Sequence, residues 1–108
     1  MRITCREAIS GLTRSFVPAA AGSLVADIYY KVTGRETGNY TLHIADGKCT
    51  FREGAPPSAS LIIETPAEVW VAIGEGRLSL SQAYKEGKLR AVGDLSLLNN
   101  LGSLFKTL

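Results

Sequence analysis

The chain of 108 residues has few of the side chains that catalysis or metal binding requires. It contains one histidine, His43, and two cysteines, Cys5 and Cys49, which lie far apart in the sequence. This spacing forms neither a CxxC pair nor a set of zinc ligands, and no GxSxG, P-loop or GxGxxG motif is present. An enzyme needs groups positioned for proton transfer, nucleophilic attack or metal binding. We therefore expect no enzyme activity, no metal and no cofactor.

Long hydrophobic runs are also lacking. No window approaches the roughly 18 apolar residues of a membrane-spanning helix, and the N-terminal residues lack the continuous apolar stretch of a signal peptide. Two distant cysteines do not form a disulfide framework, so both thiols are expected to be reduced. Residues 106–108 differ from the peroxisomal Ser-Lys-Leu signal. We expect a cytoplasmic protein with a single domain over residues 1–108, because a chain of this length builds one core.

The net charge of +2 is too small to indicate nucleic-acid binding, but the charge is unevenly distributed. Residues 1–22 carry three Arg and one Glu, residues 23–76 carry four basic and seven acidic residues, and residues 77–108 carry five basic and two acidic residues. If the two basic ends meet in space, they could favour a transient contact with an anionic membrane, by about 1 kcal/mol per basic side chain near it. The alternative is an ordinary surface of mixed charge.

Alternation of apolar and polar residues predicts five β-strands, at residues 23–33, 39–45, 48–53, 59–64 and 88–92. Asp46 and Gly47 predict a tight type I′ hairpin between the second and third strands, because both turn residues need positive φ. His43 should face the polar side of its strand as a solvated surface histidine. Cys49 shares the inward face with Phe51 and is expected to be a buried, inert thiol.

Helical spacing of apolar residues predicts about four helices. The first, from Ile3 to Phe16, is weakened by Gly11 and ended by Pro18. Two capping-box patterns, residues 65–68 and 79–82, open the middle helices, and residue 94 can cap a last helix with a stripe of leucines. Because each apolar stripe must be buried, we expect an α+β fold. Its helices should cover one face of a five-stranded mixed or antiparallel sheet.

Two segments resemble a known family. Residues 38–49, GNYTLHIADGKC, are similar to the central hairpin of the sterol carrier protein 2 family. Residues 76–94, GRLSLSQAYKEGKLRAVGD, resemble the family's short Ala-aromatic helix, followed by Gly-Lys-Leu and a strand ending in Gly-Asp. The resemblance covers roughly residues 20–105. The chain departs from the family in its short first helix and in lacking the C-terminal extension and peroxisomal tripeptide of eukaryotic members.

The resemblance implies an apolar tunnel between the sheet and the helices. It implies non-catalytic binding and intracellular transfer of an apolar ligand, either a fatty acid, a fatty acyl-coenzyme A or a sterol. Gln82 could add a polar contact at the tunnel mouth, although its position is also explained by the cap at Ser79. The side chains expected to line the tunnel come from the sheet, the middle helices and the last helix: Tyr30, Leu42, Phe51, Trp70, Ile73, Leu80, Ala83, Tyr84, Leu98, Leu101 and Phe105.

The same apolar stripes are also those of an ordinary filled core. A structural, docking or dimerisation module of the same fold is therefore the alternative, and the oligomeric state, monomer or dimer, is left open. An enzyme acting on a sheltered apolar substrate would need a catalytic pair that the sequence does not show. An empty tunnel of about 300 Å³ would cost several kcal/mol at about 24 cal/mol per Å³. We therefore expect the tunnel to be occupied or partly collapsed in the free protein.

Overall fold

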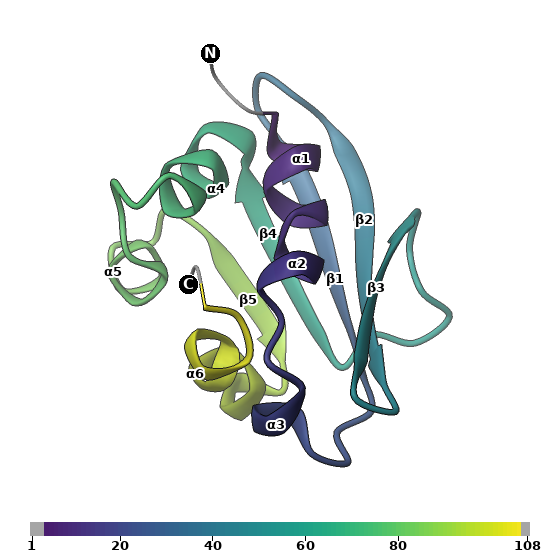
Figure 1. The fold of residues 1–108 in the computed structure, drawn as a ribbon. Coiled ribbons are helices and arrows are strands. Elements are labelled where there is room, and N and C mark those ends of the chain that lie inside the picture. The colour runs from purple at the N-terminus through teal and green to yellow at the C-terminus, as the bar shows by residue number, and fades with distance from the viewer. Residues whose placement is uncertain (1–3, 107–108) are drawn as a thin grey trace.

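One β-sheet organises the chain, and short helices cover one of its faces (Figure 1). The computed structural model describes residues 4–106, so the predicted helix start at Ile3 and residues 107–108 lie outside the described range. The strands have the spatial order β3-β2-β1-β4-β5, with β1 and β4 parallel and the other neighbours antiparallel. The predicted α+β fold is confirmed, and its sheet is mixed. The strands are β1 (Ala26–Thr33), β2 (Gly38–Ala45), β3 (Lys48–Glu53), β4 (Leu61–Pro66) and β5 (Arg90–Gly93).

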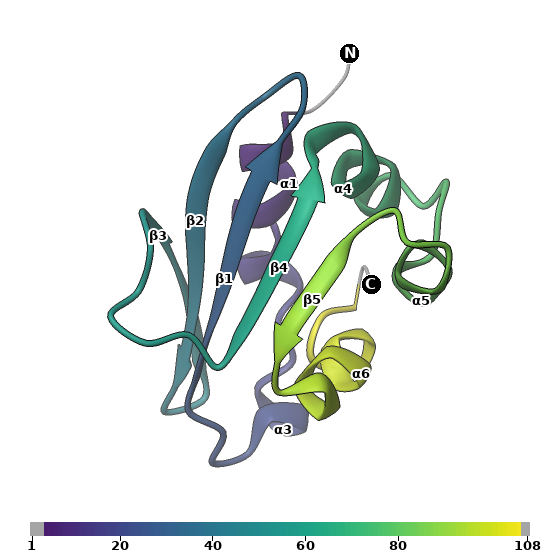
Figure 2. The ribbon, with the colours of Figure 1, turned by 180° about the vertical axis from the view of Figure 1, so that it is seen from behind.

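The pairing of the strands places their apolar side chains in rows on the covered face. Ile28 of β1 lies directly between Leu42 of β2 and Leu61 of β4, and all three are fully buried. The opposite face carries no helix of the described chain, as the view from behind shows (Figure 2). A slip of one residue in either pairing would turn a whole row of side chains away from the core. Burial of one face therefore determines the register.

The hairpin between β2 and β3 forms as predicted, with φ of 54° at Asp46 and 69° at Gly47. The next connection, residues 54–60, takes the chain past the ends of β2 and β1 to the other half of the sheet. This crossing makes β4 parallel to β1, which the strand periodicity alone did not reveal. The strand boundaries differ from the predicted ones by two or three residues at several ends.

The helices are shorter and more numerous than expected. Gly11 divides the predicted first helix into two, and Pro18 begins a further helix as its first residue as well as ending the preceding segment. Thr4 caps the first helix through a capping box with Glu7. The described helices are α1 (Cys5–Ser10), α2 (Leu12–Ser15), α3 (Pro18–Ala21), α4 (Ala67–Gly74), α5 (Leu80–Lys85) and α6 (Leu95–Leu104).

The three predicted caps had different outcomes. The Asp94 carboxylate accepts the backbone N–H groups of Ser96 and Leu97, as expected for the cap of α6. The Ser79 hydroxyl accepts from the backbone of Gln82 at 3.1 Å, but the Gln82 amide donates to Glu86 rather than back to the cap. The prediction at Thr65 was wrong. Thr65 is a fully buried residue of β4, paired with β1, and its hydroxyl donates to the carbonyl of Pro66.

The segment between α2 and α3 lies beside the end of α6, a contact that the sequence pattern does not reveal (Figure 1). Val17 donates its backbone N–H to the carbonyl of Leu104 at 2.8 Å, and Lys106 donates to the carbonyl of Ser15 at 2.9 Å. The rings of Phe16 and Phe105 pack with centroids 5.6 Å apart. This bridge fastens the end of α6 to the N-terminal helices.

Gly93 offers a test of the contact between β5 and the connection before β4. Its φ is +111°, and a Cβ there would lie 2.6 Å from the carbonyl oxygen of Ser60. Gly93→Ala is therefore expected to lower the free energy of unfolding by about 2 kcal/mol or more, through backbone strain and a clash with main-chain atoms.

Gly76→Ala is the matched control, because Gly76 also has positive φ but has open space around its Cβ position. It should show the conformational cost alone, about 1 kcal/mol. Urea denaturation measures both. Equal losses in the two variants would contradict the clash.

Candidate functional site

The interior between the sheet and α4 is centred on Tyr30 and Trp70. Both side chains are almost fully buried, and their rings meet edge to face with centroids 4.9 Å apart. The Tyr30 hydroxyl has no hydrogen-bond partner among residues 4–106. Burial raises the pKa of Tyr30, so the hydroxyl stays protonated. A neutral, unpaired donor thus lies within an otherwise apolar region.

Most of the residues predicted to line a tunnel lie together in one buried cluster. The fully or nearly fully buried ones come from the sheet, α4, α5, α6 and the residue that follows α6: Tyr30, Leu42, Trp70, Ile73, Ala83, Leu98, Leu101 and Phe105. These side chains pack against one another. Leu80 and Phe51 are half-buried, and Tyr84 is 39% exposed. The tunnel itself stays a prediction.

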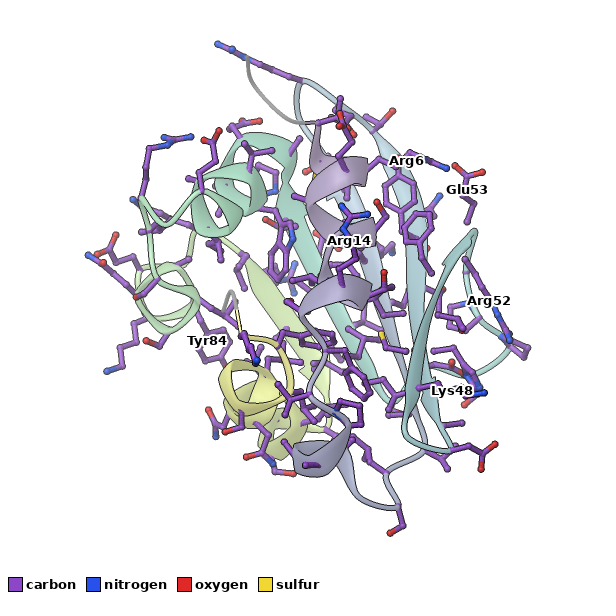
Figure 3. All side chains as sticks on the ribbon, viewed as in Figure 1. Arg6, Arg14, Lys48, Arg52, Glu53 and Tyr84 are labelled. Carbon is purple, nitrogen blue, oxygen red and sulfur yellow. The ribbon has the colours of Figure 1, made fainter. Side chains whose placement is uncertain are left out.

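An open groove of about 390 Å³ lies where α5 faces α6. Three predicted residues, Leu80, Tyr84 and Leu98, come together there, and Figure 3 labels Tyr84 in this region. Ala83 and Leu101 are buried on the same two helices. The groove is therefore a surface hollow whose helices also contribute to the buried cluster. Its lining residues are Ser79, Leu80, Ser81, Tyr84, Lys85, Leu98, Asn99 and Gly102.

Gln82, suggested as a contact at the tunnel mouth, is not among the residues that line this groove. Its side chain is held by Glu86 at 2.9 Å. A second hollow, of about 400 Å³, lies between α3 and α6 and includes Asp94, Ser96 and Asn100. The second hollow also includes leucines such as Leu24 and Leu97, but its accessible lining is mainly polar, whereas the accessible lining of the groove between α5 and α6 is mainly apolar. The groove between α5 and α6 is therefore the better candidate for an apolar ligand.

Phe51 lies away from this groove. It belongs to β3, at the edge of the sheet opposite β5, and stacks on Tyr40 with ring centroids 5.6 Å apart. The Arg6 guanidinium lies 5.3 Å from the centre of the Phe51 ring and also pairs with Glu53 at 2.8 Å (Figure 3). Phe51 therefore lies at the edge of the core, next to the ion pair between Arg6 and Glu53. The structure does not bring it together with the residues of the groove.

The two thiols are held in their neutral form. Burial raises the pKa of Cys5 to about 12, with a further contribution from the nearby carboxylates of Glu36 and Glu68. Burial also raises the pKa of Cys49 to about 11. Cys49 is half-buried rather than fully buried as expected, but its raised pKa fits the predicted inert thiol.

His43 lies on the uncovered face of the sheet, as predicted, but it is not simply solvated. Its Nδ1 lies 2.6 Å from the Asp27 carboxylate, which is directly opposite in the pairing of β1 and β2. This pair could not be predicted from the sequence, because it depends on the register of β1 and β2. Among residues 4–106, no group of three or more His, Cys, Asp or Glu side chains is arranged to hold a metal ion. None of the helices in the same range has the length and apolarity to cross a bilayer.

The chain forms an α+β fold in which helices cover one face of a mixed sheet, above an apolar interior and beside an open groove. The model of the SCP-2 sterol transfer family matches residues 17–106, and the chain belongs to this family. No curated protein matches the chain in sequence.

Solved structures share the fold at low identity. The palmitated SCP2L2 from Aedes aegypti has 15% identity and a TM-score of 0.75, over 94% of this chain and 93% of that one. The UbiJ-SCP2 ubiquinone synthesis protein has 19% identity and a TM-score of 0.71, over 92% and 90%. The sec-alkylsulfatase Pisa1 from Pseudomonas sp. has 21% identity and a TM-score of 0.74, but this chain spans only 15% of its length. The fold thus also occurs within a much larger enzyme.

The raised pKa values of the two thiols predict a pH dependence of stability. Folding raises both values from the ordinary 9.0, so the folded protein holds these protons more tightly than the unfolded chain does. The thiols' contribution to the free energy of unfolding is therefore complete below pH 9 and is lost as the pH rises toward 11 and 12.

Urea unfolding at about pH 8 and about pH 10 measures this loss, since thiols titrate in this range. A variant with Cys5→Ala and Cys49→Ala is the control, because it retains the other titrating groups. It should lose less stability than the wild type over this interval. An identical loss in the two proteins would show that the thiols do not contribute.

Proposed function

We propose that this protein is a non-catalytic, cytoplasmic carrier that binds an apolar ligand, either a fatty acid, a fatty acyl-coenzyme A or a sterol. The groove between α5 and α6 carries the proposal, because it brings Leu80, Tyr84 and Leu98 together above buried apolar residues of the same helices. Membership of the sterol transfer family supports the ligand class. The palmitated Aedes aegypti structure supports it as well, since it shares this fold.

The ligand would enter from the groove by separating α5 from α6. α5 has only six residues. It lies between Gly76, four residues before its start, and Gly87, two residues after its end, and both glycines have positive φ. Short helices depend on tertiary packing for their stability, so a small displacement of α5 costs less than separating two strands. An acyl chain that enters the interior would recover about 0.8 kcal/mol for each buried CH₂ group, which offsets the displacement.

Basic side chains beside the groove are consistent with delivery at an anionic membrane. Lys85 lines the groove and is exposed. Arg77 and Lys88 are exposed on either side of α5, where each forms an ion pair, with Glu75 and Glu86 respectively, that a membrane contact would have to replace. Each basic side chain close to an anionic surface contributes about 1 kcal/mol. We propose this contact as a transient step in loading or release.

A filled-core docking or dimerisation module is the competing function. The observation that favours it is the close packing of the buried cluster, in which Tyr30 contacts Trp70 and Phe105 contacts Phe16. Such a module would need no ligand, so ligand binding distinguishes the two functions.

The carrier function predicts that a ligand stabilises the folded protein. Palmitate, palmitoyl-coenzyme A and cholesterol should be tested separately by thermal denaturation and by the fluorescence of Trp70, the single tryptophan. A bound ligand at about 100 times its Kd adds about 2.7 kcal/mol to the free energy of unfolding, and the Tm should rise with ligand concentration. Native mass spectrometry should show one bound ligand per chain. A Tm that does not change with any of the three ligands, together with a concentration-dependent oligomer, would favour the docking module.

The groove predicts where a substitution interferes. Leu80→Glu places a carboxylate among the apolar lining residues and should weaken palmitate binding about tenfold or more, equal to about 1.4 kcal/mol. Because Leu80 is only half-buried, the variant should fold. Val92→Glu is the matched control, since Val92 is 57% exposed on β5 and does not line the groove. Fluorescence titration measures both, and equal affinities in the two variants would exclude the groove as the route of entry.

A further inference from the structure

The hydroxyl of Tyr30 is a polar group without a function in the packed interior. The residue is fully buried, and the hydroxyl has no partner among residues 4–106. Buried polar groups in folded proteins are almost always hydrogen-bonded, because an unpaired one loses its hydration without compensation. A phenylalanine would fill nearly the same space without this loss. The hydroxyl is therefore available to form a hydrogen bond with a molecule from outside the chain.

The position of Tyr30 suits contact with a ligand in the interior. Tyr30 lies on the central strand β1, between Tyr40 of β2 and Ile63 of β4, and its ring meets that of Trp70 on α4. Trp70 is the largest buried side chain of the helical layer above the sheet. A ligand that separates this layer from the sheet would thus contact the Tyr30 side chain.

The surroundings of Tyr30 favour a neutral partner. The thiols of Cys5 and Cys49 are the ionisable groups that act on Tyr30, and both stay protonated. Among residues 4–106, no lysine, arginine or histidine side chain is buried with this cluster, so an incoming carboxylate would lose its hydration without gaining a counter-ion. A neutral oxygen avoids this cost and can accept the hydrogen bond.

We propose that Tyr30 is the internal hydrogen-bond donor for a neutral oxygen, in an alcohol, ketone or ester, carried by an otherwise apolar ligand. The ligand then lies with this oxygen directed inward, beneath α4. In a fatty acid or a fatty acyl-coenzyme A, the anionic group would instead remain at the groove, near Lys85. This inference rests on the proposed carrier function and adds a preference for neutral oxygenated lipids within it.

The test compares two ligands that differ only in the oxygen, 1-dodecanol and dodecane, by titration of Trp70 fluorescence. Tyr30→Phe is expected to weaken binding of 1-dodecanol about tenfold and to leave dodecane binding unchanged. Tyr29→Phe is the matched control. Tyr29 is adjacent on β1, but its hydroxyl donates to Asn39 at 2.8 Å, on the uncovered face, so binding of both ligands should be unchanged.

The outcomes separate the two proposals. If the wild type binds both ligands and Tyr30→Phe affects them equally or not at all, the role of Tyr30 is overturned and the carrier function stands. If the wild type binds neither ligand and none of the lipids tested above, both proposals fail. Without ligand, Tyr30→Phe should have a Tm equal to or above that of the wild type, because it removes an unpaired hydroxyl. A clearly lower Tm would show that the hydroxyl is already paired in the free protein, for example by a buried water, and would also overturn the inference.

Discussion

The structure depends on keeping water away from one face of the sheet. Ile28, Leu42 and Leu61 form a fully buried row across three strands, held by one antiparallel and one parallel pairing. The helices that cover this row are between four and ten residues long, and isolated helices of that length are not stable in water. They exist because their apolar sides pack on the sheet. In the same way, the sheet keeps its register because the helices bury one of its faces.

A domain of this kind faces two opposing requirements. Stability favours an interior in which side chains fill all the space, and the contact of Tyr30 with Trp70 is of this type. Ligand binding needs room in the same interior. The fold can meet both if the helical layer moves against a fixed sheet. The strands are joined by continuous hydrogen bonds, whereas α5 is a six-residue helix between two glycines with positive φ, beside an open groove.

Several features could be predicted from the residues alone because they depend on local chemistry. Alternation located the strands, Asp46 and Gly47 located the tight turn, and Asp94 located the start of α6. The local rules failed where tertiary contacts outweighed them. Thr65 has the residues of a capping box after it, yet pairing with β1 keeps it in β4. Likewise, Pro18 begins α3 as well as ending the segment before it. The backbone bridge between Phe16 and Phe105 lies just before this helix.

The sequence by itself identified most of the buried residues, since apolar spacing requires a covered face whatever the topology is. It did not show that Thr65 is buried or that Phe51 is only half-buried. Only the tertiary structure decided which of the predicted lining residues meet at a groove. Leu80, Tyr84 and Leu98 meet there because α5 faces α6, whereas Phe51 lies at the other edge of the sheet beneath Arg6. The pairing of His43 with Asp27 and the unpaired hydroxyl of Tyr30 also depend on register and packing between distant segments, and local residue patterns carry no information about either.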